Sequence, residues 1–209
     1  ESLDFVMNLI NNNNEIVPKI IAPKKYDSDK RTIIIDPKEY DSANKIWIRK
    51  PPAPFKVIPS YQEVHKEFRK IVTIDYDKKT AIFDISVEHI SPVFAFELLS
   101  MIINEFNQLE QNKDINEAEK AISYLQEQAA QITVNDINKN INELIEIHLN
   151  TLMTAEISDF YKLEPISLPF IPEEKSWPPR ALICIIAFIL GFFVSTFYVL
   201  GSSFLRQSY

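Results

Sequence analysis

Helical spacing of apolar residues predicts two short helices near the start of the chain. In 61–71 apolar side chains recur at intervals of three and four, which places them on one helical face, and Ser60 is positioned to cap that helix. Residues 2–10 are predicted to form a shorter helix with Ser2 as a possible cap, ended by the four asparagines at 11–14. Between 15 and 59 the pattern is irregular or strand-like.

Patterns typical of strands follow in three places. The runs at 31–35 and 45–49 are rich in β-prone residues. Two further runs flank the turn sequence DKK, which predicts an antiparallel hairpin with strands near 70–76 and 80–88. In the second strand of the hairpin we expect Ile82 on the same face as Ile85 and Val87, with Phe83 out of step.

A very long helical region is expected after this hairpin. From Val93 to Glu164 the chain has 72 residues without proline or glycine, whereas globular helices average roughly 11–12 residues. Ser91 stands at the cap position and Pro92 at the first turn, where its missing N–H costs nothing. We therefore expect helix over 93–160, with a kink or short break at 110–114.

The second half of this region carries a seam of apolar positions separated by three and four residues, as in a coiled coil. Its first part is Ile115, Ala118, Ile122, Leu125, Ala129 and Ile132. After a break in phase at 133–136, where we expect a register shift or bend, it resumes at Ile137, Ile141, Leu144, His148, Leu152 and Ala155. Ile122, Leu125, Leu144 and His148 are therefore expected on a buried seam that needs a partner along its length. The alternative is a compact helical bundle made by two broken halves.

Prolines end the helical region, because a proline inside a helix removes a hydrogen bond and clashes with the preceding turn. They stand at positions 165, 169, 172, 178 and 179. Residues 160–168 are predicted to add an edge strand to the hairpin, and the rest is expected to form an extended strap.

The end of the chain has the pattern of a transmembrane helix. Ala181 to Leu205 is 25 residues without a charge, about 38 Å as a helix, against a hydrocarbon core of about 30 Å. Ala187, Gly191 and Ser195 are spaced by four on one face, which favours close helix association. A membrane helix is predicted within 178–206, and a buried helix of a soluble protein is the alternative.

Composition narrows the function classes. The net charge of −7 argues against nucleic acid as a partner. The two glycines, Gly191 and Gly201, both lie in the apolar segment, so the chain has no glycine-rich phosphate loop. The sole cysteine, Cys184, permits no intrachain disulfide, and the three histidines lack metal-ligand spacing. We expect no catalytic residue, no cofactor and no metal site.

The order of these features resembles a known family. A strand hairpin, a helix start at SP, a long helix with EAEKAISYLQEQ and ELIEIHLNTLMTAE, and a proline-rich entry to an apolar segment with PPRALI and ILG follow one another between Tyr61 and Phe204. This arrangement is similar to the polysaccharide co-polymerases, the Wzz-type determinants of O-antigen chain length.

The resemblance implies an α+β fold with a membrane-proximal α/β base of antiparallel strands (31–88 and 160–168), a very long extended helix, and a C-terminal transmembrane helix. Residues 1–177 would form a periplasmic domain anchored by 178–206 in the bacterial inner membrane, in a fragment lacking the first membrane helix. Family members form homo-oligomeric rings and act with the membrane polysaccharide polymerase on lipid-linked polysaccharide. Assembly or polymerase coupling is then expected of Pro169, Pro172, Pro178, Pro179 and Gly191.

Two other functions remain open from the sequence. One is a capsule or exopolysaccharide export co-polymerase that works with a separate tyrosine kinase. The other is a tail-anchored coiled-coil tether, although a tether needs neither the strand hairpin nor the proline-rich strap.

Overall fold

The computed structural model describes residues 2–131, 135–171 and 184–196 of the chain. It divides into two units, Glu1–Ile171 and Pro172–Tyr209, which are described separately.

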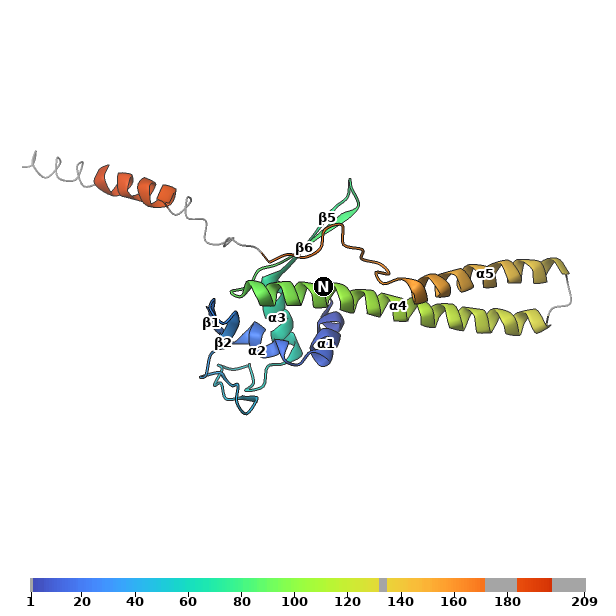
Figure 1. Ribbon diagram of the computed structural model, residues 1–209, viewed down its shortest axis with the longest axis horizontal. Helices are drawn as coiled ribbons and strands as arrows, with labels where there is room; N and C mark the ends of the chain where they lie inside the picture. Colours follow the sequence, from blue (N-terminus) through green and yellow to red (C-terminus); the bar gives the residue numbers. More distant parts are fainter. Residues whose placement is uncertain (1, 132–134, 172–183, 197–209) are drawn as a thin grey trace, which may run out of the picture. The chain divides into compact units, whose positions relative to one another are not determined.

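The core of the first unit is built by short helices packed on the start of one long helix. Helices α1 (Leu3–Asn12) and α3 (Tyr61–Ile71) begin as predicted, because the side chains of Ser2 and Ser60 accept hydrogen bonds from the amides of Phe5 and Glu63. Both helices bury their apolar faces against α4 (Pro92–Gln131) and one another (Figure 1). The cluster consists of Val6, Leu9, Ile10, Ile16, Ile20, Val64, Phe68, Val72, Phe94, Leu98 and Ile102.

Between α1 and α4 the chain forms, besides α3, one more short helix and three pairs of strands. Helix α2 (Ile16–Ile21) lies where we expected irregular or strand-like chain, and it forms because Ile16 and Ile20 reach the core. Strands β1 (Pro23–Asp27) and β2 (Thr32–Ile35) pair antiparallel, as do β3 (Tyr40–Asp41) and β4 (Ile46–Trp47). The β-prone run at 31–35 is thus confirmed as a strand from Thr32 on, whereas the run at 45–49 is a strand only at Ile46 and Trp47.

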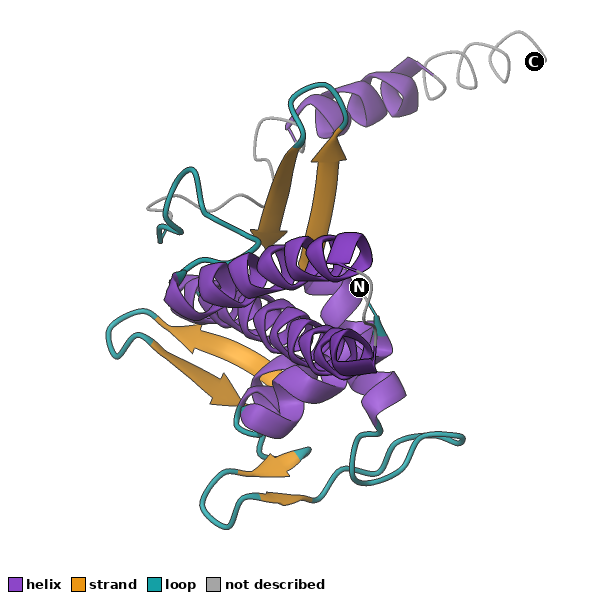
Figure 2. Cartoon of the chain, turned by 90° about the vertical axis from the view of Figure 1, so that its right-hand side faces the viewer, coloured by secondary structure: helices purple, strands orange, loops and turns teal. Residues whose placement is uncertain are grey.

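The predicted hairpin is confirmed as β5 (Val72–Asp77) and β6 (Ile82–Val87). Its register places Phe83 opposite Tyr76 and Ile85 opposite Ile74, all on one face. Ile82 lies on the other face, so the expectation that Phe83 is out of step was wrong. The hairpin projects from the helices on the side opposite β3 and β4 (Figures 1 and 2).

The long helical region is a pair of helices. Helix α4 starts at Pro92, with the Ser91 hydroxyl accepting from the Phe94 amide, and continues without a break through 110–114, so the predicted kink there was wrong. Helix α5 (Asn135–Ile157) runs back along the second half of α4 (Figure 1). The predicted bend at 133–136 falls largely outside the described residues. The expectation of a long helix is confirmed by α4, and α5 packs against its second half, as in the alternative of two packed halves.

The strap, residues 158–171, has no strand, so the predicted edge strand at 160–168 was wrong. Its backbone amides at Lys162 and Leu163 bond to the side chain of Asn107 on α4 instead of to β6. Pro165 has no N–H to donate to a strand.

In the second unit, residues 184–196 are helical. Among the described parts of the chain, no helix combines the length and the apolar character that crossing a bilayer requires. Much of the predicted membrane helix, together with Pro172, Pro178 and Pro179, lies outside the described residues.

Candidate functional site: the helical hairpin and the strap

The seam between α4 and α5 is formed by two lines of side chains that face each other. On α4, Ala118 is buried and Ile122 and Leu125 are half-buried, as the heptad spacing predicts. On α5, Ile141 and Ala155 are buried and His148 is half-buried. The partner that the α4 seam requires is therefore α5 of the same chain.

Leu144 does not belong to this seam. Its side chain is 47% exposed, and Ile145 takes the half-buried position between Ile141 and His148. The line through Ile141, Ile145, His148 and Leu152 keeps intervals of four, three and four, which a helix needs to hold one face towards its partner. The expectation that Leu144 is buried was off by one residue.

Leu144 belongs instead to an outer apolar set on α5, which the described residues leave uncovered. Ile147 and Met153 are exposed as well, at 58% and 59%. Leu144 and Ile147 are three residues apart and so lie side by side on the helix. We call Leu144 and Ile147 the outer edge of α5.

A buried asparagine of α4 holds the strap. Asn107 is 5% exposed, and its Nδ2 donates to the carbonyl of Leu163 at 3.0 Å. Its Oδ1 accepts from the backbone amides of Lys162 and Leu163 at 2.9 and 2.8 Å. One side chain thus satisfies three backbone groups, which explains why this stretch makes no strand.

A second contact, about two turns further along α4, fixes the same part of the strap. Asp114 pairs with the ammonium group of Lys162 at 2.9 Å and accepts from the Tyr161 hydroxyl at 2.7 Å. These hydrogen bonds, the one from Lys162 first, lower the pKa of Asp114. Its neighbour Gln111 donates through Nε2 to the carbonyl of Ala155 and so ties α4 to the end of α5.

Sequence reasoning did not find this clamp of Asn107 and Asp114 on residues 161–163. The signal for Asn107 was a polar residue of low helix propensity within the apolar stretch at the start of α4, where a buried amide needs partners. Asp114 lies in the polar run that suggested a kink at 110–114. The polar side chain of Asp114 binds residues of the strap, and the helix continues through 110–114.

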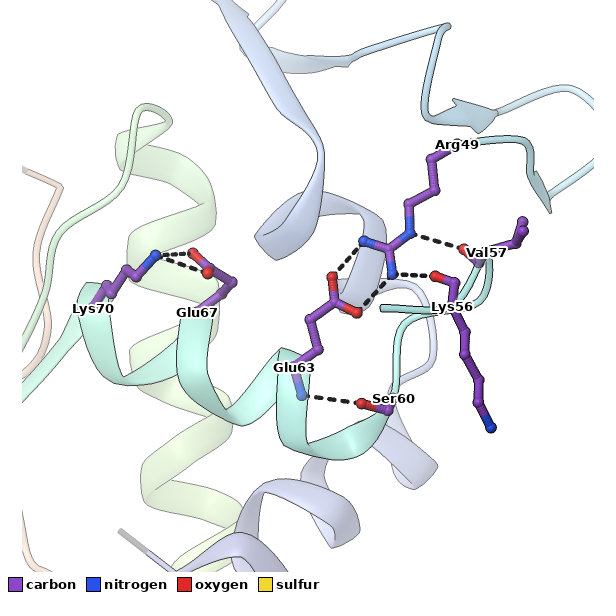
Figure 3. A network of polar contacts seen from close by, with 7 residues as sticks. All are labelled: Arg49, Lys56, Val57, Ser60, Glu63, Glu67 and Lys70. Atoms are coloured by element: carbon purple, nitrogen blue, oxygen red, sulfur yellow. Dashed lines mark hydrogen bonds and ion pairs between the residues drawn. The ribbon is translucent and has the colours of Figure 1, made fainter. Parts of the chain in front are cut away.

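A buried ion pair joins α3 to the segment that precedes it (Figure 3). Arg49 and Glu63 have side chains only 7% and 11% exposed, and both guanidinium Nη atoms donate to the carboxylate. Arg49 also donates to the carbonyls of Lys56 and Val57, at 2.7 and 2.8 Å. The hydrogen bond to Glu63 raises the pKa of Arg49.

His89 joins α2 to the start of α4. Its Nδ1 accepts from the Ser91 amide at 3.1 Å, so Nε2 carries the proton that it donates to the Lys19 carbonyl at 3.0 Å. Burial lowers the pKa of His89, since a charged ring loses hydration there. The Lys19 side chain, which pairs with Glu97, lies over the neighbouring Phe94 ring.

Of the other predicted site residues, Pro169 lies in the strap, and Ala187, Gly191 and Ser195 lie in the second unit. Pro169 is half-buried in the strap. In the second unit, Ala187, Gly191 and Ser195 are exposed. Among the described residues, a Cβ placed on Gly191 would meet no atom within 4 Å beyond its chain neighbours and the backbone of its own helix. Within the described residues no group of three or more His, Cys, Asp or Glu side chains is placed to hold a metal ion.

Comparison with models of known protein families found no match, and comparison with curated proteins found no significant one.

Proposed function

We propose that this chain is a non-enzymatic regulator of surface polysaccharide chain length, with O-antigen of lipopolysaccharide as its polymer. It acts as a homo-oligomer in the bacterial inner membrane, with most of the chain in the periplasm, beside the polysaccharide polymerase and its lipid-linked product. The proposal rests on the order of elements. The β5–β6 hairpin, α4 starting at Ser91–Pro92, α5, and the proline-containing strap follow one another as in the Wzz-type family.

The outer edge of α5 supports the oligomeric part of the proposal. Leu144 and Ile147 are large apolar side chains beside the α4–α5 seam, and the seam already has its intramolecular partner. Exposed apolar side chains that lie next to one another mark a surface for another protein. In the proposed ring this edge meets the neighbouring copy.

The test compares two aspartate substitutions on α5 in cells that lack the chromosomal gene. Leu144→Asp places a charge on the outer edge, whereas Asn142→Asp places the same charge on an exposed position about half a turn away. Because both positions are exposed, both variants are expected to fold. We expect Leu144→Asp to yield smaller oligomers and a shifted or broadened polymer ladder, and Asn142→Asp to yield the normal ladder.

Two results would count against the proposal. A normal ladder and intact oligomers with Leu144→Asp would show that the outer edge takes no part in assembly. An O-antigen ladder that does not depend on the gene at all would favour the capsule or exopolysaccharide function, for which the size of the secreted polymer is the readout.

A further inference from the structure

Residues 45–58, here called the basic segment, combine positive charge with exposed apolar side chains. Its four cations are Lys45, Arg49, Lys50 and Lys56, and it contains no Asp or Glu, although the chain as a whole carries a net charge of −7. Its large apolar side chains are exposed by 40–69%, and they are Ile46, Ile48, Phe55, Val57 and Ile58. Exposed apolar side chains concentrated in one short segment mark a surface that contacts a membrane, a ligand or another protein.

The ion pair of Arg49 and Glu63 holds the basic segment in a fixed shape. The guanidinium group is nearly buried and binds the carbonyls of Lys56 and Val57, so it ties the end of the segment to its middle (Figure 3). The segment is thus preorganised, and ordering it on a partner costs little conformational entropy.

Two of the four cations are left for a partner. Lys45 pairs with Glu15 at 3.0 Å, and Arg49 pairs with Glu63. Lys50 and Lys56 are exposed and make no ion pair with the described residues, and the Lys56 side chain extends away from α3 (Figure 3). Both flank the prolines at positions 51, 52 and 54.

The β5–β6 hairpin offers a useful comparison. It also exposes apolar side chains, including Ile74, Tyr76 and Phe83. However, it carries three aspartates, at positions 75, 77 and 84, against two lysines. An anionic surface would repel the hairpin and attract the basic segment. The two surfaces both expose apolar side chains, and their charge is what distinguishes them.

We infer that the basic segment is a lipid-contacting surface that seats on an anionic phospholipid bilayer. Lysines next to exposed aliphatic and aromatic side chains are the combination that interfacial membrane segments use, with the apolar groups entering the headgroup boundary. Each lysine near an anionic surface contributes roughly fivefold in affinity, or about 1 kcal/mol. This contact does not depend on whether the chain regulates polymer length.

The experiment measures lipid contact at one position of the full chain in nanodiscs. The single cysteine is removed with Cys184→Ser, and Ile58→Cys is labelled with the environment-sensitive fluorophore NBD. Lys120→Cys, on an exposed position of α4, carries the same label as a control. We expect spin-labelled lipids to quench the label at 58 in phosphatidylglycerol discs, and the label at 120 to stay unquenched.

The charge requirement is tested with Lys50→Gln/Lys56→Gln in the Ile58→Cys background. Removing two lysines should lower the ratio of lipid-bound to lipid-free segment on the order of thirtyfold. Quenching at 58 should then fall to the level at 120, with an unchanged circular dichroism spectrum because both lysines are exposed.

Three results would overturn the inference. Equal quenching at 58 and 120 would show no lipid contact by the segment. Equal quenching at 58 in phosphatidylcholine and phosphatidylglycerol discs would show that anionic lipid is not what it recognises. Shielding of the label at 58 that depends on protein concentration, without lipid quenching, would assign the surface to a second protein copy.

Discussion

The clamp on the strap can be tested by removing one side chain, with Asn107→Ala. The substitution deletes three hydrogen bonds, to the amides of Lys162 and Leu163 and to the carbonyl of Leu163. At a net 0.5–1.5 kcal/mol for each bond, the strap loses about 1.5–4.5 kcal/mol of local stability. If the strap opens as a unit, the two amides should exchange with solvent roughly 10 to 2,000 times faster.

The matched control is Asn116→Ala on the same helix. Asn116 is exposed, and among the described residues its side chain bonds to the carbonyl of Asn112 alone, within α4. Both substitutions gain the same helix propensity, so the difference between them isolates the clamp.

Hydrogen exchange followed by mass spectrometry, with peptides covering 158–171, reads out the effect. We predict fast exchange at Lys162 and Leu163 with Asn107→Ala and protection close to that of the parent chain with Asn116→Ala. Unchanged protection at these two amides, with a lower global stability, would show that Asn107 stabilises α4 and does not hold the strap.

The other predictions concern the core and the register of α5. Glu63→Gln leaves the buried Arg49 without a carboxylate and should lower the unfolding free energy by about 3–5 kcal/mol, measured by urea titration. A loss below about 1 kcal/mol would show that the ion pair does not stabilise the fold. Because the pKa of His89 is lowered on folding, the unfolded chain binds the proton more readily, so stability should be full above about pH 6.5 and fall as the pH drops below it. His89→Gln should flatten this dependence, and an unchanged slope would assign it to another group. Ile141→Ala should lower the unfolding free energy by about 2–4 kcal/mol and Leu144→Ala by under about 1 kcal/mol, because of the two only Ile141 is buried. Equal losses would show that Leu144 lies in the seam.

Local signals in the sequence predicted much of the fold correctly. The serines at 2, 60 and 91 act as helix caps at the expected places, because a cap depends only on a few neighbouring residues. The β5–β6 hairpin follows from a turn between two β-prone runs for the same reason. The 61–71 helix matches the structure at both ends.

The errors arose where distant parts of the chain decide the outcome. Whether the helical region extends as one rod or folds back depends on contacts between α4 and α5, and heptad spacing is the same in both cases. The strap depends on Asn107, more than fifty residues earlier. Pairing of Arg49 with Glu63 joins two charged residues whose surroundings in the sequence show nothing unusual.

Control of polysaccharide length is tested most directly by the size distribution of the surface polymer itself. Lipopolysaccharide is resolved on a gel from cells with the full-length gene present, deleted and then restored. We predict a modal cluster of O-antigen bands that collapses to a random distribution on deletion and returns on restoration. A ladder that is identical in the three strains would contradict chain-length control of O-antigen.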